Sequence, residues 1–212
     1  MGAAAILAAL DAGGELEQAL AVLRAAGQPE PEALEVAAGD RLLLAALEQA
    51  TGAGVELTAR CPACGALSCA QVTAGSVPAV RPRNAVLGGG GVRAPRYRDL
   101  AGLPADERQA TDELLRRCVV GRPARAPVAA DLERVDDALT GPVAMACSAC
   151  GEPLAVDVDV QAAVLQRLVR AARAVEREIH LLAGAYHWTL AEIRGLPDAQ
   201  RSALARLVED ER

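Results

Sequence analysis

Two cysteine pairs are the residues of this sequence best suited to chemistry. The chain reads Cys-Pro-Ala-Cys-Gly at 61–65 and Cys-Ser-Ala-Cys-Gly at 147–151. Two Cys-x-x-Cys pairs supply the four thiolates of a tetrahedral zinc site, with Zn–S bonds of about 2.3 Å. The glycine after each pair permits a positive-φ turn that directs backbone amides toward the sulfurs. The spacing predicts a structural zinc site formed by Cys61, Cys64, Cys147 and Cys150.

A thiol redox pair is the main alternative for such cysteines. A thioredoxin-like pair stands at the start of a helix, after a strand of a βαβ unit. Here apolar, strand-like stretches flank both pairs, at 55–59 and 66–72 around the first and at 143–146 and 154–158 around the second. They predict two hairpins with a cysteine knuckle at each tip, which is a zinc ribbon. Four thiolates leave no coordination position for a substrate, so the expected role of zinc is architectural.

The remaining candidates for chemistry are isolated. His180 and His187 lie seven residues apart, but no acidic residue forms a recognised metal pattern with them, so packing or capping is the expected role. Cys69 and Cys118 are interpreted as core residues, because free cysteines are commonly buried. The sequence contains no nucleophile elbow, phosphate-binding loop or dinucleotide fingerprint. We therefore expect no catalytic site.

Composition limits both the core and the partners. Of the 212 residues 52% are hydrophobic, but only 1% are aromatic, so a core of Leu, Val and Ala on closely packed helices is expected. All 22 basic residues are arginines, and the net charge of −6 argues against a general polyanion binder. The arginines between 81 and 98 lie in a Gly/Pro-rich stretch without interleaved aromatics, which favours a solvated linker over a nucleic-acid site.

Neither a signal sequence nor a membrane span is predicted. The apolar stretch at 1–10 lacks a basic region and is followed at once by Asp11. No later stretch approaches the roughly 20 uncharged apolar residues that a spanning helix needs. A soluble, cytoplasmic protein is expected, in a reducing compartment where cysteines suit metal binding better than disulfides.

The hydrophobic spacing and the breaks predict an α+β fold, mostly helical, with a small zinc-ribbon-like β element formed by the two hairpins. Helices are expected at 99–120, at 131–139 and from 160 to about 185, and a capping box of Thr189 and Glu192 starts a further one. Six segments result: an N-terminal helical segment (1–52), the first knuckle hairpin (53–75), a Gly/Pro-rich flexible loop (76–96), a helical insertion (97–140), the second knuckle hairpin (141–159) and a C-terminal helical hairpin (160–212).

The C-terminal part of the chain resembles a known group of proteins. The string at 178–193, EIHLLAGAYHWTLAEI, followed by Leu196-Pro197 and Arg201, is similar to the ending of accessory proteins encoded with phage-tail-like contractile injection systems. Those proteins resemble the baseplate hub assembly group of contractile-tailed phages. The order of the earlier motifs extends the likeness: RLLLAAL at 41–47, RDL at 98–100, LRRC at 115–118, and the second knuckle before a long helix.

The resemblance implies a non-enzymatic assembly chaperone or structural accessory of a contractile-particle baseplate. Its partners would be baseplate or tail proteins, met in the bacterial cytoplasm. The turn at Tyr186, His187 and Trp188 holds two of three aromatics and is a candidate interface if exposed, or packing if buried. Two alternatives stay open: a zinc-ribbon nucleic-acid-binding or transcription adaptor with a C-terminal helix-turn-helix, and a thiol redox enzyme.

Overall fold

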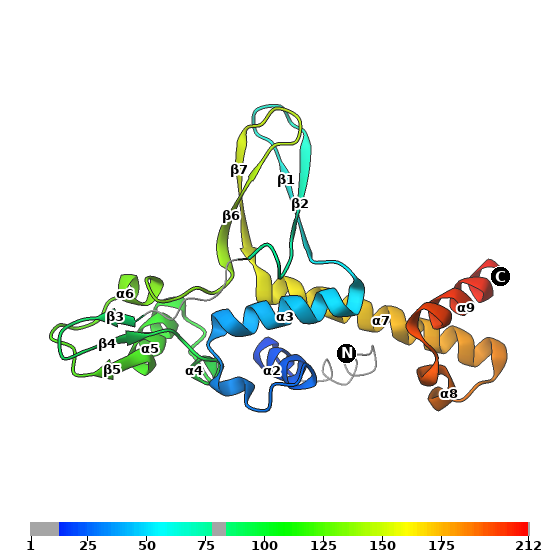
Figure 1. The fold of residues 1–212 in the computed structure, drawn as a ribbon, viewed down its shortest axis with the longest axis horizontal. Helices are drawn as coiled ribbons and strands as arrows, with labels where there is room; N and C mark the ends of the chain where they lie inside the picture. Colours follow the sequence, from blue (N-terminus) through cyan, green and yellow to red (C-terminus); the bar gives the residue numbers. More distant parts are fainter. Residues whose placement is uncertain (1–12, 78–83, 212) are drawn as a thin grey trace.

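The computed structural model describes residues 13–77 and 84–211 and has the predicted α+β fold. Two β-hairpins stand side by side on a base of three helices (Figure 1). A small mixed module lies at one end of this base, and a helical arm extends from the other. The apolar stretch at 1–10, in which no signal or span was predicted, lies outside the described residues.

The base consists of α2 (Glu15–Ala25), α3 (Val36–Thr51) and the first half of α7 (Val160–Tyr186). A 3-10 turn, η1 (Pro31–Ala33), connects the first two, and Gly52 ends α3 in the left-handed conformation with φ of 73°. Leucines and valines at three- and four-residue spacing face one another between these helices. This main core is fully buried at Val22, Leu23, Leu43, Leu44, Leu47, Val164 and Leu168.

Each hairpin is a separate two-stranded antiparallel sheet. β1 (Val55–Arg60) pairs with β2 (Leu67–Val72), and β6 (Thr140–Ala146) pairs with β7 (Pro153–Asp159). One end of each hairpin lies at the main core, where Val55 and Leu57 are buried, and the knuckle lies at the opposite end. Far from the base, the small apolar cluster at the tips includes two of the knuckle cysteines themselves.

The prediction of an irregular loop over 76–96 is wrong for two stretches. β3 (Asn84–Val86), β4 (Gly90–Arg93) and β5 (Val119–Gly121) form a three-stranded sheet in the order β3-β4-β5. The glycines permit close strand approach rather than disorder: a Cβ on Gly91 would lie 2.1 Å from the Ala85 carbonyl oxygen, and one on Gly90 2.5 Å from that of Val120. Residues 78–83, with Arg81 and Arg83 of the predicted linker, lie outside the described residues.

The helices of the insertion are shorter than predicted. In place of one helix over 99–120 there are α4 (Tyr97–Leu100) and α5 (Glu107–Cys118), because Pro104 interrupts the chain and Asp106 caps α5 by accepting the Gln109 N–H at 2.9 Å. The helix predicted at 131–139 is α6 (Ala129–Glu133). With the sheet, these helices enclose a second core of Val92, Leu115, Cys118, Leu132 and Val135.

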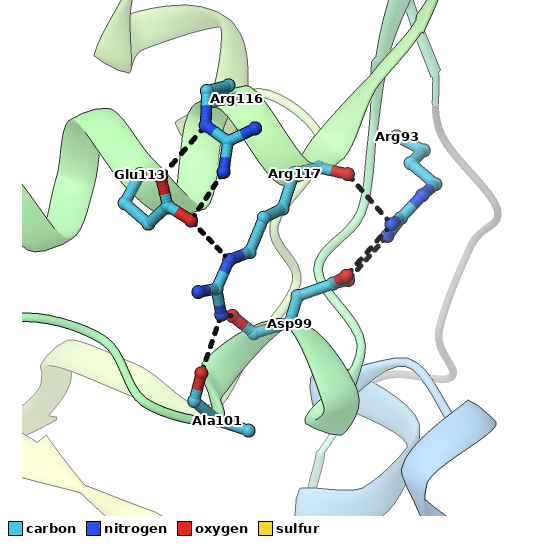
Figure 2. Close-up of polar contacts among 6 residues, drawn as sticks. All are labelled: Arg93, Asp99, Ala101, Glu113, Arg116 and Arg117. Atoms are coloured by element: carbon cyan, nitrogen blue, oxygen red, sulfur yellow. Dashed lines mark hydrogen bonds and ion pairs between the residues drawn. The ribbon is translucent and has the colours of Figure 1, made fainter.

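A network of charged side chains joins α4, α5 and β4 (Figure 2). The Arg93 guanidinium donates to both carboxylate oxygens of Asp99, at 2.6 and 3.0 Å, and to the Arg117 carbonyl oxygen. Arg117 in turn donates to the carbonyl oxygens of Asp99 and Ala101 and to Glu113. This bidentate pairing lowers the pKa of Asp99 against the opposing effect of burial, which is the larger single influence. Arg93 therefore has an internal partner and is not part of a free arginine cluster.

The C-terminal arm is the second half of α7 with α8 (Leu190–Gly195) and α9 (Asp198–Asp210) packed on its end (Figure 1). Its small core contains Leu182, Ile193, Ala205 and Val208. The predicted capping box is present: Thr189 Oγ1 accepts the Glu192 N–H at 3.3 Å, and Glu192 accepts the Thr189 N–H at 2.8 Å. Within the described chain, no helix has the length and apolar character to cross a membrane.

Candidate metal centre

The four predicted cysteines meet at the tips of the two hairpins. Their sulfur atoms all lie within 4.8 Å of one another. Two sulfur–sulfur contacts join one knuckle to the other: Cys61 Sγ lies 3.7 Å from Cys150 Sγ, and Cys64 Sγ lies 3.6 Å from Cys147 Sγ. Cys61 and Cys147 are buried, whereas Cys64 and Cys150 are exposed at the tips of the hairpins. The cluster predicted from spacing is therefore present.

The two knuckles have the same backbone geometry. In the first, the Cys61 N–H donates to the Ala66 carbonyl oxygen at 2.8 Å, and the Gly65 N–H donates to the Cys61 carbonyl oxygen at 2.9 Å. Gly65 has φ of 74° and Gly151 has φ of 77°, so the glycine after each pair supplies the left-handed turn expected of it. The second knuckle repeats both hydrogen bonds, at 2.8 and 2.9 Å, among Cys147, Gly151 and Glu152.

A pair of serines supports the cysteines and was missed from sequence. Ser68 on β2 is only 1% exposed; its hydroxyl accepts the Ser148 N–H at 3.0 Å and lies 3.3 Å from the Ser148 hydroxyl. Arg60 donates to the Gly65 carbonyl oxygen at 2.9 Å and closes the first knuckle from the strand side. The alternation of β2 carried a signal, since Ser68 shares its face with the inward-facing positions of that strand.

The cysteine thiols of the centre differ in pKa. Hydrogen bonding from the backbone N–H of Cys150, then from that of Ala149 and from the Ser68 hydroxyl, lowers the pKa of Cys147 to about 6. The Glu152 N–H acts in the same direction on Cys150, but the neighbouring sulfurs of Cys64 and Cys147 outweigh it and raise the pKa of Cys150 to about 12. A cation among the sulfurs would favour the thiolate form of all four.

The donor set fits a metal ion. A tetrahedron with metal–sulfur bonds of about 2.3 Å has edges of about 3.8 Å, and the two sulfur pairs that join the knuckles lie at 3.6 and 3.7 Å. These distances also exceed the S–S bond of about 2.05 Å, and the cysteines are free thiols. Both knuckles are followed by strands rather than by a helix, unlike a thioredoxin-like pair. Cys61, Cys64, Cys147 and Cys150 can hold a metal ion.

Two further cysteines lie outside this cluster. Cys118 is fully buried as predicted, and burial raises the pKa of its thiol to about 11. The prediction that Cys69 belongs to the core is wrong, because it is exposed. Since neighbouring residues of a strand face opposite sides, the inward position of Ser68 places Cys69 outward.

The turn at Tyr186, His187 and Trp188 lies on the arm, away from the metal centre (Figure 1). Tyr186 is 39% exposed and Trp188 36% exposed, and their rings stack with centroids 4.8 Å apart. His187 caps α7 with φ of 56°, and its N–H donates to the Ala183 carbonyl oxygen. The turn therefore meets the exposure condition for an interface, while neither His180 nor His187 belongs to the described cysteine cluster.

A buried carboxyl beneath the hairpins was also missed from sequence. Asp40 on α3 is 1% exposed; its Oδ2 accepts the Leu139 N–H at 2.9 Å, and its Oδ1 accepts the Tyr97 hydroxyl at 3.5 Å. Burial raises the pKa of Asp40 to about 6, against the opposing effect of the Leu139 hydrogen bond. Asp40 thus connects the base, the insertion and the segment that enters β6.

Comparisons with protein-family models, with curated protein sequences and with solved structures found no match to this chain. The fold and the site therefore define the class: a mostly helical α+β protein with a zinc-ribbon-like, four-cysteine centre between two hairpins.

Proposed function

We propose that the cysteine centre binds one structural zinc ion, and that the protein is a non-enzymatic assembly chaperone or structural accessory of a phage-tail-like contractile-particle baseplate. The observation that carries the proposal is the exposed, stacked Tyr186–Trp188 pair. It lies within the string at 178–193 on which the resemblance to baseplate accessory proteins rests. The metal centre keeps the fold together, and the arm contacts partners in the bacterial cytoplasm before the particle is complete.

The donor chemistry supports zinc. Four thiolates in two hairpin knuckles are a usual structural zinc set, and four protein ligands complete a tetrahedral shell. A shell of this kind leaves no position at which a substrate coordinates. Structural zinc contributes roughly 10–16 kcal/mol of binding free energy to folding. In this protein the ion joins two hairpins that are far apart in the sequence, at 55–72 and 140–159.

The arm has the features of a protein-binding element. Tyr and Trp are enriched among the residues that dominate binding energy, because they bury large areas at little entropic cost. Of the three aromatic residues in the chain, Tyr97 is buried, whereas Tyr186 and Trp188 are exposed. Leu190, two residues after Trp188 in the sequence, is also exposed, at 49%. The packed core of α7, α8 and α9 holds this surface in place.

Co-purification tests the proposal. The affinity-tagged chain, expressed from its own locus, should retain baseplate or tail proteins, and the double variant Tyr186→Ala/Trp188→Ala should lose them. Val128→Ala, at a position 52% exposed in the insertion, is the matched control. Gene deletion should reduce the number of complete contractile particles seen by electron microscopy. Normal particles after deletion, with no such protein retained by the tagged chain, would contradict the proposed function.

A further inference from the structure

The outer face of α7 carries a row of basic side chains, three arginines and one histidine. Arg170, Arg173, Arg177 and His180 follow one another at three- and four-residue spacing and are all exposed. At 100° per residue they share one side of the helix, opposite the side that buries Val164, Leu168 and Ala172. They also line one shallow groove on the protein surface, together with Glu176. We call these four residues the arginine row.

The arginine row is unpaired in the described parts of the chain. No described residue forms a hydrogen bond or ion pair with the side chains of Arg170, Arg173 or Arg177. Elsewhere, arginines bind carboxylates: Arg93 binds Asp99, Arg125 binds Asp131, and Arg201 binds Glu178. The contrast shows three guanidinium groups whose donors all remain available to a partner.

The arginine row also acts against the stability of its own helix. Arg173 and Arg177 are like charges at i,i+4, a pair that destabilises a helix by a few tenths of a kcal/mol, and the single Glu176 in the groove offsets only part of this repulsion. Placing glutamates at alternate positions would have stabilised the same face. A use outside the helix therefore accounts for the row better than helix stability does.

We propose that the arginine row is a docking surface for an acidic helix of a partner protein. Successive members of the row are separated by a rise of about 4.5 to 6 Å, which is also the rise between carboxylates at i, i+3 and i+7 of another helix. The planar guanidinium group matches a carboxylate through two parallel hydrogen bonds. Tyr186 and Trp188 lie beyond the end of the row, so this surface is distinct from the aromatic pair. The docking proposal therefore does not depend on the proposed role in a contractile particle.

Charge argues against a second copy of the chain and against nucleic acid as the ligand of the arginine row. A second copy cannot dock through the same face, because the two arginine rows would repel. The chain as a whole carries a net charge of −6, and Glu176 lies within the groove, so the field around the row is too weak and too local for a nucleic-acid backbone. No aromatic side chain is interleaved with the row to stack on bases.

Fluorescence anisotropy with a designed peptide tests the proposal. The probe is a fluorescein-labelled, alanine-rich helix of about 20 residues with glutamates at i, i+3, i+7 and i+10; its control carries glutamines at the same positions. At about 50 mM salt the full-length protein should bind the glutamate peptide at least about tenfold more tightly than the glutamine peptide, and about 200 mM salt should weaken the binding. Equal affinity for the two peptides would overturn the proposal.

Variants locate the binding. R170E/R173E/R177E should remove the preference for the glutamate peptide, whereas R108E/R122E/R206E, an equal change of charge at other exposed arginines, should retain it. R170Q/R173Q/R177Q repeats the test without charge reversal, and circular dichroism with zinc content verifies the fold of each variant. Tighter binding of a duplex oligonucleotide through the same arginines, or self-association that R170E/R173E/R177E abolishes, would overturn the acidic-helix assignment.

Discussion

The Ser68 hydroxyl accepts the backbone N–H of Ser148 at 3.0 Å and thereby joins the first hairpin to the knuckle of the second. Ser68 is only 1% exposed, whereas Ser148 is exposed, so this hydrogen bond is partly buried. The same hydroxyl contributes to the lowered pKa of Cys147. One side chain therefore connects the two knuckles and increases the thiolate character of Cys147, a candidate metal ligand; groups behind a metal site usually have this role.

Ser68→Ala should weaken both the fold and the metal site. The substitution removes the acceptor of the Ser148 N–H from a partly buried hydrogen bond, which costs about 0.5–1.5 kcal/mol of unfolding free energy, and loss of a group behind the site is expected to lower metal affinity by about 10–100-fold. Urea denaturation and competition with a zinc chelator measure the two effects. Ser148→Ala is the control, because it keeps the N–H donor and removes only the hydroxyl contact at 3.3 Å. Equal effects of the two variants would contradict the role given to the hydrogen bond.

Cys147→Ser should remove most of the stability that the metal provides. The variant loses a buried ligand, so the metal free energy of roughly 10–16 kcal/mol is largely forfeited. We expect zinc content to fall from one equivalent toward zero, and the melting temperature to fall by more than about 10 °C. Elemental analysis and thermal unfolding check both values. Cys69→Ser, at an exposed cysteine outside the cluster, should leave them unchanged; unaltered zinc content in Cys147→Ser would refute the four-cysteine assignment.

The cluster of four cysteines could be predicted from sequence because each knuckle is a local structure. Each Cys-x-x-Cys-Gly forms its own turn, so the identity and spacing of Cys61 and Cys64 determine how they present sulfur. The supporting residues could not be predicted in the same way. Ser68 acts through a residue on another hairpin, and Asp40 through the backbone of Leu139. Such partners depend on tertiary contacts between distant segments: the alternation of β2 indicates that Ser68 faces inward, but not which residue of the other hairpin it meets.

In the Gly/Pro-rich segment, a local sequence signal was present but predicted the wrong structure. A glycine run lowers strand propensity, so a loop was predicted around Gly90 and Gly91. In the structure the same glycines let β4 approach the backbones of β3 and β5 more closely than a side chain would permit. The glycine run does have a low intrinsic preference for strand structure, but the close packing of three short strands stabilises the sheet despite it. The start of the helix after Thr189 was predicted correctly, because a capping box depends on residues within one turn, whereas the ends of the helices in the insertion were not.

Arg201→Ala should loosen the C-terminal arm selectively. The Arg201 guanidinium is nearly buried and donates to Glu178 on α7 and to Asp198 at the start of α9. Removing it leaves Glu178 without its cation, at a cost of about 2–3 kcal/mol after allowance for the partial exposure of the carboxylates. Hydrogen exchange should become faster in α9 and the end of α7, and remain unchanged in α3. Arg206→Ala, at an exposed position of α9, is the control; protection of α9 equal to that of the native chain would contradict the prediction.

Asp40 should make stability depend on pH. Its pKa rises from 3.8 to about 6 on folding, chiefly because the carboxyl is buried. Between these values the folded state binds more protons than the unfolded state, so the contribution of this group is fully present below 3.8 and is lost as pH rises through 6. The total loss is on the order of 3 kcal/mol of unfolding free energy, of which roughly half falls between pH 5 and 7.5.

Asp40→Asn removes this titration but keeps an oxygen that can accept the Leu139 N–H. We therefore expect the variant to be more stable than the native chain at pH 7.5, with the difference between the two shrinking as pH falls to 5. Urea denaturation at several pH values measures the difference in unfolding free energy between the variant and the native chain. Both proteins have the same cysteine cluster, so its pH dependence cancels in this difference. Asp157→Asn makes the same chemical change at an exposed position of β7 and should give no such trend. A constant difference between Asp40→Asn and the native chain across this range would show that the Asp40 carboxyl does not titrate there.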